Sequence, residues 1–147
     1  MSAIGDGSGE VRATGGCLCG AVRYEVRGPL RDVVLCHCSR CRHTHGHVAA
    51  YAACDAKDLI VAEAGALRWY EEDDRARGFC GGCGASLLWR AAGRGTVSIA
   101  AGTLDQPTGL TTVAHIFTRE AGDYYEISGE GERFPAGLPP GGAPVRT

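Results

Sequence analysis

The sequence lacks the features that direct proteins into membranes or onto nucleic acids. Its apolar runs fall short of the roughly 20 residues that a membrane span needs. Residues 1–6 have neither a basic flank nor a hydrophobic segment, so we expect no signal peptide and a cytoplasmic location. The net charge of −2 disfavours a nucleic-acid partner, because such proteins usually carry a basic surface.

Strong helix signals are also scarce, whereas short apolar segments recur between turn residues. The 23 glycines suit a chain with many tight turns. Only residues 39–43 and 55–59 could each form a helical turn. The sequence therefore predicts a mainly β domain, with strands at 21–26, 33–35, 48–53, 59–62, 67–70, 86–89, 96–101, 111–117 and 124–127.

The composition predicts one folded domain between two irregular ends. Apolar residues make up 44% of the chain and charged residues 22%, which is typical of a globular protein. Residues 1–14 are rich in glycine, serine and charge, and we expect a flexible N-terminus there. Residues 135–147 are rich in proline and glycine, and we expect a disordered tail. The domain itself is expected at 15–134.

Eight cysteines in a chain expected in the cytosol indicate metal binding before disulfides. Cys17 and Cys19 are two residues apart, so in an extended segment both point to one face. Cys80 and Cys83 form a CxxC motif followed by glycine. The four thiolates match the usual set for a closed structural zinc site, with Zn–S bonds of about 2.3 Å. A redox dithiol at Cys80 and Cys83 would need a helix after the first cysteine, which the glycines at 81–82 disfavour.

A second cysteine group, Cys36, Cys38 and Cys41, offers only three thiolates. Three ligands leave the fourth corner of a zinc tetrahedron open, which is the layout of a catalytic site. A histidine or Cys54 could instead close that corner, although a lone cysteine is more often a small buried hydrophobe. Zinc bound by three thiolates has a formal charge of −1 and acidifies water poorly. Because thiolate-rich sites favour soft ligands, the sequence favours a thiol cosubstrate.

The side chains around this group have more than one plausible role. His37 lies between two cysteines, so in a strand it would face away from the metal. Three histidines follow the cysteines: His43, His45 and His47. One of them could shuttle a proton near neutral pH, and the other two are expected at the surface or behind the ligands. His115 would be either a satisfied, half-buried residue or part of the site. Arg40 and Arg42 could bind carboxylates of an anionic cosubstrate or lie on the solvated surface.

The order of these motifs resembles the glutathione-dependent formaldehyde-activating enzyme family, which includes centromere protein V-like domains. The matching segments are 16–20, 36–42 and 79–84, with further support at 98–105, 115–117 and 122–126. The resemblance runs from about residue 15 to residue 134. It implies a zinc-stabilised single domain with the mainly β, Mss4-like β-tent fold.

The resemblance also implies two zinc ions and an activity. Structural zinc would be held by Cys17, Cys19, Cys80 and Cys83, and catalytic zinc by the group Cys36, Cys38 and Cys41. The family's named activity joins formaldehyde to glutathione as S-hydroxymethylglutathione, and it is classed as a carbon–sulfur lyase from the reverse direction. A small thiol and a small aldehyde would then be the partners.

Two other functions use the same cysteines. The chain could be a zinc-stabilised binding or adaptor module without catalysis, or it could store or sense zinc. A binding module needs only one structural zinc and gains nothing from an open second site. The three-cysteine group therefore favours an enzyme.

Overall fold

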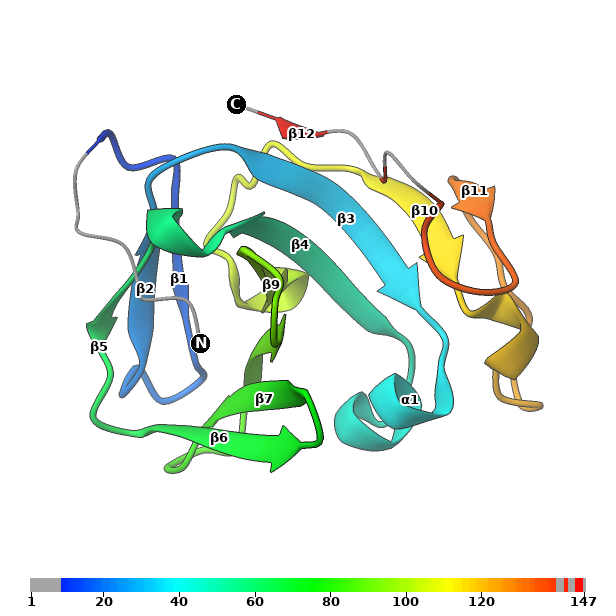
Figure 1. Ribbon diagram of the computed structural model, residues 1–147, viewed down its shortest axis with the longest axis horizontal. Helices are drawn as coiled ribbons and strands as arrows, with labels where there is room; N and C mark the ends of the chain where they lie inside the picture. Colours follow the sequence, from blue (N-terminus) through cyan, green and yellow to red (C-terminus); the bar gives the residue numbers. More distant parts are fainter. Residues whose placement is uncertain (1–8, 140–141, 143–144, 147) are drawn as a thin grey trace.

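The computed structural model describes residues 9–139, 142 and 145–146, and in this part of the chain it has one α-helix among many short strands (Figure 1). The first strands are β1 (Ala13–Gly16), β2 (Arg23–Val26), β3 (Leu30–Cys36), β4 (Ala49–Asp55), β5 (Leu59–Glu63) and β6 (Leu67–Glu72). They are followed by β7 (Arg75–Cys80), β8 (Ser86–Ala91), β9 (Thr96–Ala100), β10 (Thr112–Ile116), β11 (Glu132–Arg133) and β12 (Val145–Arg146). The helix is α1 (Ser39–His45), and short 3₁₀ turns form η1 (Ala56–Asp58), η2 (Ala101–Thr103) and η3 (Thr118–Glu120).

The strands form two sheets, which confirms the predicted mainly β single domain. The small sheet has the order β1-β2-β5, and the large one runs β11-β10-β3-β4-β9-β8-β7-β6, with β12 also paired to β3. Strands β3 and β4 form a long curved pair across the molecule, with the small sheet at one end and α1 near the other (Figure 1). Strand β10 runs parallel to β3, so residues distant in sequence meet along that edge.

Alternating burial along the strands builds the main core. In β2 the burial pattern places Tyr24 and Val26 inside, both at most 2% exposed, and the residues between them outside. Leu30, Leu87 and Ile99 join this cluster from the large sheet. A second, smaller buried cluster contains Cys36, Cys41, Ala49, Tyr51 and Ala100. The three-cysteine group is therefore built into packed structure.

The predicted elements differ from the observed ones at several places. No strand forms at 124–127, because this segment is irregular and its tyrosine rings pack on histidines instead. Strands β1, β7, β11 and β12 were not predicted. In β7 the inward residues Ala76 and Gly78 are too small to give a hydrophobic pattern. Of the two expected helical turns, the first is α1 and the second contains η1.

The expectations for the chain ends are only partly covered by the structure. Residues 1–8, 140–141, 143–144 and 147 lie outside the described part. Within that part β1 begins at Ala13, the Phe117 N–H donates to the Ala136 carbonyl, and β12 pairs with β3. The domain limits of 15–134, the flexible N-terminus and the disordered tail stay predictions.

Candidate metal centres

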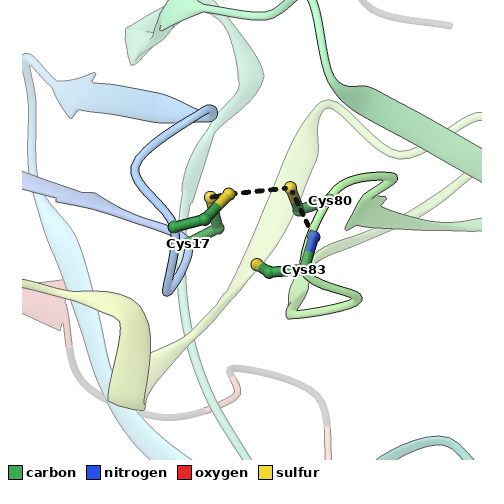
Figure 2. Close-up of side chains that lie close together, drawn as sticks. Cys17, Cys80 and Cys83 are labelled. Atoms are coloured by element: carbon green, nitrogen blue, oxygen red, sulfur yellow. Dashed lines mark hydrogen bonds between the residues drawn. The ribbon is translucent and has the colours of Figure 1, made fainter.

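The four flanking cysteines meet between two turns. Cys17 and Cys19 lie in the turn between β1 and β2, Cys80 is the last residue of β7, and Cys83 lies in the turn between β7 and β8. Figure 2 shows Cys17, Cys80 and Cys83 directed toward one space between these turns. All four sulfurs lie within 4.8 Å of one another. The turns are brought together by packing of Cys17 and Cys80 in the main core.

The sulfur spacing in this four-cysteine group fits a tetrahedral metal. Zn–S bonds of about 2.3 Å place the sulfurs of a tetrahedron about 3.8 Å apart. The Cys17–Cys19 and Cys19–Cys80 sulfur distances are 3.7 and 3.8 Å. These two distances match a tetrahedral zinc site, so the group could hold such an ion.

Backbone N–H groups around the same cysteines favour thiolates. The Cys80 sulfur accepts from the N–H groups of Gly82 and Cys83 at 3.3 and 3.4 Å. Hydrogen bonds from the backbone of Cys19 and Ala85 lower the pKa of Cys83 to about 6. Such donors stabilise the negative charge that a metal-binding sulfur must carry.

The second group is formed where β3 passes into α1. Cys36 ends the strand, Cys38 is the N-cap of the helix, and Cys41 lies in its first turn. The Cys38 sulfur accepts from the Cys41 N–H at 3.3 Å, so the cap itself brings the second and third ligands together. Hydrogen bonds from the thiols of Cys36 and Cys41 lower the pKa of Cys38. The helix ends at Gly46, whose φ of 78° is the left-handed conformation that glycine adopts readily.

In the described residues, this group consists of three ligands and no fourth. The three sulfurs lie within 4.8 Å of one another, and no histidine, aspartate, glutamate or further cysteine of the described part of the chain joins them. Cys54 lies instead in the main core at 5% exposure, and burial raises its pKa to about 12. The expectation that Cys54 is a buried hydrophobe is confirmed.

A cleft of about 560 Å³ opens beside the three cysteines. Its walls come from β3, β4, α1, β7 and β8, and they include Tyr51, Trp89 and Phe117. Arg77 reaches from β7 to the cysteines, where its Nη2 lies 3.9 Å from the Cys41 sulfur. The sequence motifs do not include Arg77, because it lies 36 residues from Cys41 and only the pairing of strands brings the two together.

The histidines take up separate positions. His37 and His115 are buried and hydrogen-bonded to each other, with 3.0 Å between His37 Nε2 and His115 Nδ1. His37 also contacts the Tyr125 hydroxyl through Nδ1 at 2.6 Å. Both ring nitrogens of His115 have hydrogen-bond partners. This agrees with the first of the two expectations, except that the residue is fully rather than half buried. His45 contacts the Tyr51 hydroxyl, and His47 contacts the Tyr124 hydroxyl. His43 contacts the Ser39 carbonyl of the helix.

The two arginines singled out in the sequence also differ in position. Arg40 lines the cleft, but its guanidinium forms an ion pair with Glu72. Arg42 is not part of the cleft lining, and its Nε is buried without a hydrogen-bond partner in the described residues.

No helix in the described part of the chain is both long and apolar enough to cross a membrane. A search of curated proteins found no match. Among solved structures, a crystal structure titled as a Rhodobacter sphaeroides protein is similar, with a TM-score of 0.53 and 29% sequence identity. The similarity covers 63% of this chain and 88% of the other.

The match to a protein family covers more of the sequence than this structural similarity does. The model of the glutathione-dependent formaldehyde-activating enzyme family matches residues 12–120. This range includes all seven clustered cysteines and the cleft-lining Arg77. The family's description links glutathione to the activation of formaldehyde. The match covers well over half of the sequence, and the chain therefore belongs to the glutathione-dependent formaldehyde-activating enzyme family.

Proposed function

We propose that this chain is a zinc-dependent enzyme that joins a thiol of the glutathione type to a small aldehyde such as formaldehyde. The same enzyme would cleave the adduct in the reverse direction, as a carbon–sulfur lyase. One observation carries the proposal: three converging thiols, Cys36, Cys38 and Cys41, face a cleft without a fourth ligand in the described residues. A metal with a free position beside a cavity can take up a substrate, whereas a closed site cannot.

We assign the two cysteine groups different tasks. Cys17, Cys19, Cys80 and Cys83 would hold a structural zinc that joins the β1–β2 turn to the β7–β8 turn. The group Cys36, Cys38 and Cys41 would hold the catalytic zinc at the start of α1. The sulfur-rich donor sets support zinc, which is usually bound by four ligands when structural and by three when catalytic.

The chemistry follows from the ligand set. A zinc ion at the three-cysteine group would supply a position where an incoming thiol loses its proton to solvent. The thiolate sulfur would attack the aldehyde carbon, so that a C–S bond forms and the electron pair of the C=O π bond moves to oxygen. That oxygen would take one proton back, equal to the one the thiol lost, which completes the hydroxyalkyl thioether without an oxidant or a reductant.

The chain's own residues prepare the cleft for this reaction. Tyr51 and Trp89 give it apolar surfaces, which limit water around the reacting sulfur. Arg77 places a fixed positive charge beside Cys41 and offsets the excess negative charge of three thiolates around a divalent ion. Tyr51 lines the cleft and could donate the proton to the new oxygen. Its hydroxyl hydrogen-bonds to His45, and burial raises its pKa.

The proposal is tested by exchange NMR between formaldehyde and its glutathione adduct. Because uncatalysed addition is itself quick, the quantity of interest is the rate above background at matched pH. The native protein should accelerate exchange and Cys38→Ser should not. S-methylglutathione lacks the ionisable sulfur and should give no adduct.

The competing function has a clear signature in the same experiment. Equal rates for native protein and Cys38→Ser, over several thiols and aldehydes, would reject the enzyme. A zinc-stabilised binding module, which needs only the four-cysteine group, would then take its place.

A further inference from the structure

The cleft beside the three cysteines is lined by an excess of positive charge. Five arginines face it against two carboxylates, which are Asp74 and Glu120. The arginines are Arg31, Arg40, Arg75, Arg77 and Arg94. A divalent ion bound by three thiolates would add one negative charge, and the cleft would still have an excess of positive charge. A cavity with this balance attracts an anionic ligand.

Two of the five arginines are already neutralised. Arg40 forms an ion pair with Glu72, and Arg75 Nε lies 3.6 Å from the Asp74 carboxylate. Glu120 accepts a hydrogen bond from the Ser39 N–H. In the described residues, no ion pair involves Arg31, Arg77 or Arg94.

The Arg77 guanidinium contacts a cysteine and has one buried nitrogen without a hydrogen bond in the described residues. Its Nη2 contacts the Cys41 sulfur, while its Nη1 is buried and makes no hydrogen bond in the described residues. Buried N–H groups are rarely left unpaired in native proteins, so this nitrogen can take an acceptor that the described residues do not supply. Because Arg77 also lines the cleft, the ligand would bind next to the cysteines.

Arg31 is a second cation that forms no ion pair within the described part of the chain. Its Nη2 donates to the Tyr51 carbonyl at 2.8 Å and its Nε to the Asp32 carbonyl at 3.2 Å. These bonds fix the guanidinium but leave its charge uncompensated. Burial lowers the pKa of Arg31, which shows that the site disfavours a cation on its own. An anion bound beside it would remove that cost.

We propose that Arg77 and Arg31 form a carboxylate-binding site, so that the cleft selects thiols that carry carboxylates over neutral thiols. Arg94 is an exposed residue of the cleft lining, with its guanidinium carbon 5.4 Å from the centroid of the Trp89 ring, and its charge adds to the attraction. The proposal rests on the proposed function, because it assigns the residues that recognise the thiol partner. It gives this role to other arginines than Arg40 and Arg42, for which the sequence left carboxylate binding and a surface position open.

The ligand side is tested first, on unaltered protein loaded with zinc. S-methylglutathione keeps both carboxylates of the tripeptide but cannot form a thiolate, so its binding is independent of the reaction. Its dimethyl ester removes both negative charges. By titration calorimetry we expect the ester to bind about ten- to a hundred-fold more weakly, since each charge-assisted hydrogen bond contributes at this scale.

The protein side uses matched arginines of the same cleft. Arg77→Gln and Arg31→Gln should each weaken S-methylglutathione binding about ten-fold or more. Arg40→Gln and Arg75→Gln remove cleft arginines that already have carboxylate partners, and should change affinity less than about two-fold. Arg77→Lys keeps the charge without the fork and should fall between native protein and Arg77→Gln. Zinc content and circular dichroism are recorded for each variant.

The possible results separate this proposal from the proposed function. Equal affinity for acid and ester, or no binding of either, overturns the carboxylate site; the ester comparison decides even if a variant misfolds. Native-like affinity of well-folded Arg77→Gln and Arg31→Gln overturns the assignment too. Arginine-dependent binding without any catalysed exchange rejects the enzyme but leaves the anion site. Catalysed exchange with arginine-independent binding rejects only the site.

Discussion

His37 Nε2 and His115 Nδ1 are 3.0 Å apart in the buried interior, and their partners fix which nitrogen carries each proton. His115 Nε2 lies 3.1 Å from the Glu130 carbonyl, which can only accept, so this nitrogen donates. With both rings neutral, His115 Nδ1 then accepts from His37, and His37 Nδ1 accepts from the Tyr125 hydroxyl. Burial lowers the pKa of His37, in agreement with a neutral ring. The chain of bonds ties the 121–134 segment to the strand that carries Cys36.

This hydrogen-bond chain predicts that two adjacent tyrosines contribute differently to stability. Tyr125→Phe removes the donor to buried His37, and should lower the free energy of unfolding by about 1 kcal/mol. Tyr124→Phe also removes a hydroxyl bonded to a histidine, but Tyr124 is 59% exposed, so its loss should have little effect. Urea unfolding of both variants measures the difference. Equal losses for the two variants would show that the buried hydrogen bonds of His37 add nothing to stability.

The sequence was sufficient to predict the three-cysteine group and the two flanking cysteine pairs because the spacing within each is local. That the two pairs join followed from the four thiolates that usually hold a structural zinc. Cys36 and Cys38 lie on either side of one residue, and the helical turn that brings Cys41 back is only three residues long. The mainly β fold was also predictable, since most strands have an alternating or apolar pattern. The burial alternation of Tyr24 and Val26 in β2 is an example.

Other parts of the site depend on long-range pairing that local patterns do not contain. His37 meets His115 only because β10 runs parallel to β3 in a register that sets His115 opposite Leu35. Arg77 follows an acidic run at 71–74, so the sequence around it resembles a solvated surface. Its place beside Cys41 is set by β7. This strand could not be predicted from the sequence, because its inward residues are small.

The two cysteine groups should respond differently to mutation. Native protein purified without chelator should contain two zinc ions per chain by elemental analysis. Cys80→Ser should give unfolded or insoluble protein, because binding of structural zinc supplies on the order of 10–16 kcal/mol of apparent folding free energy in small zinc peptides. Cys41→Ser should stay folded and retain one zinc. Circular dichroism and thermal melting compare them, and equally severe unfolding of the two variants would mean that the roles are wrongly assigned.

Gly15 lies where the small sheet meets the loop after β9, and the structure leaves no room for a side chain there. A Cβ at this position would overlap the Tyr24 hydroxyl and would lie 2.5 Å from the Thr103 carbonyl oxygen. These two residues are themselves joined by a 2.7 Å hydrogen bond between hydroxyls. Gly15→Ala should therefore lower the free energy of unfolding by about 1–3 kcal/mol.

Gly102→Ala is the matched control for this substitution. Gly102 lies in η2, beside Thr103, and a Cβ there would meet no heavy atom within 4 Å. Its effect should stay within about 0.5 kcal/mol. Chemical unfolding of both variants provides the comparison, and a Gly15→Ala protein as stable as the native one would show that the Tyr24–Thr103 contact can move without loss.

His45 should make the stability of the protein depend on pH. Its Nε2 is 2.8 Å from the Tyr51 hydroxyl, and burial lowers its pKa below the ordinary value of 6.5. Because the folded state binds the proton less well than the unfolded state, the contribution of His45 is fully present above the unfolded pKa. It is lost as pH falls from about 6.5 toward the lower folded pKa.

Comparison with a variant isolates this effect from zinc release in acid, which destabilises any form of the protein. His45→Gln keeps a polar side chain but cannot titrate. Native protein and His45→Gln are unfolded in urea at several values between pH 8 and pH 5.5, with zinc content measured at each. As pH falls below about 6.5, the native protein should lose more stability than the variant, so any advantage it has at pH 8 should shrink. A constant difference across this range would mean that His45 has the same pKa in the folded and unfolded states, and that burial beside Tyr51 does not oppose its charge.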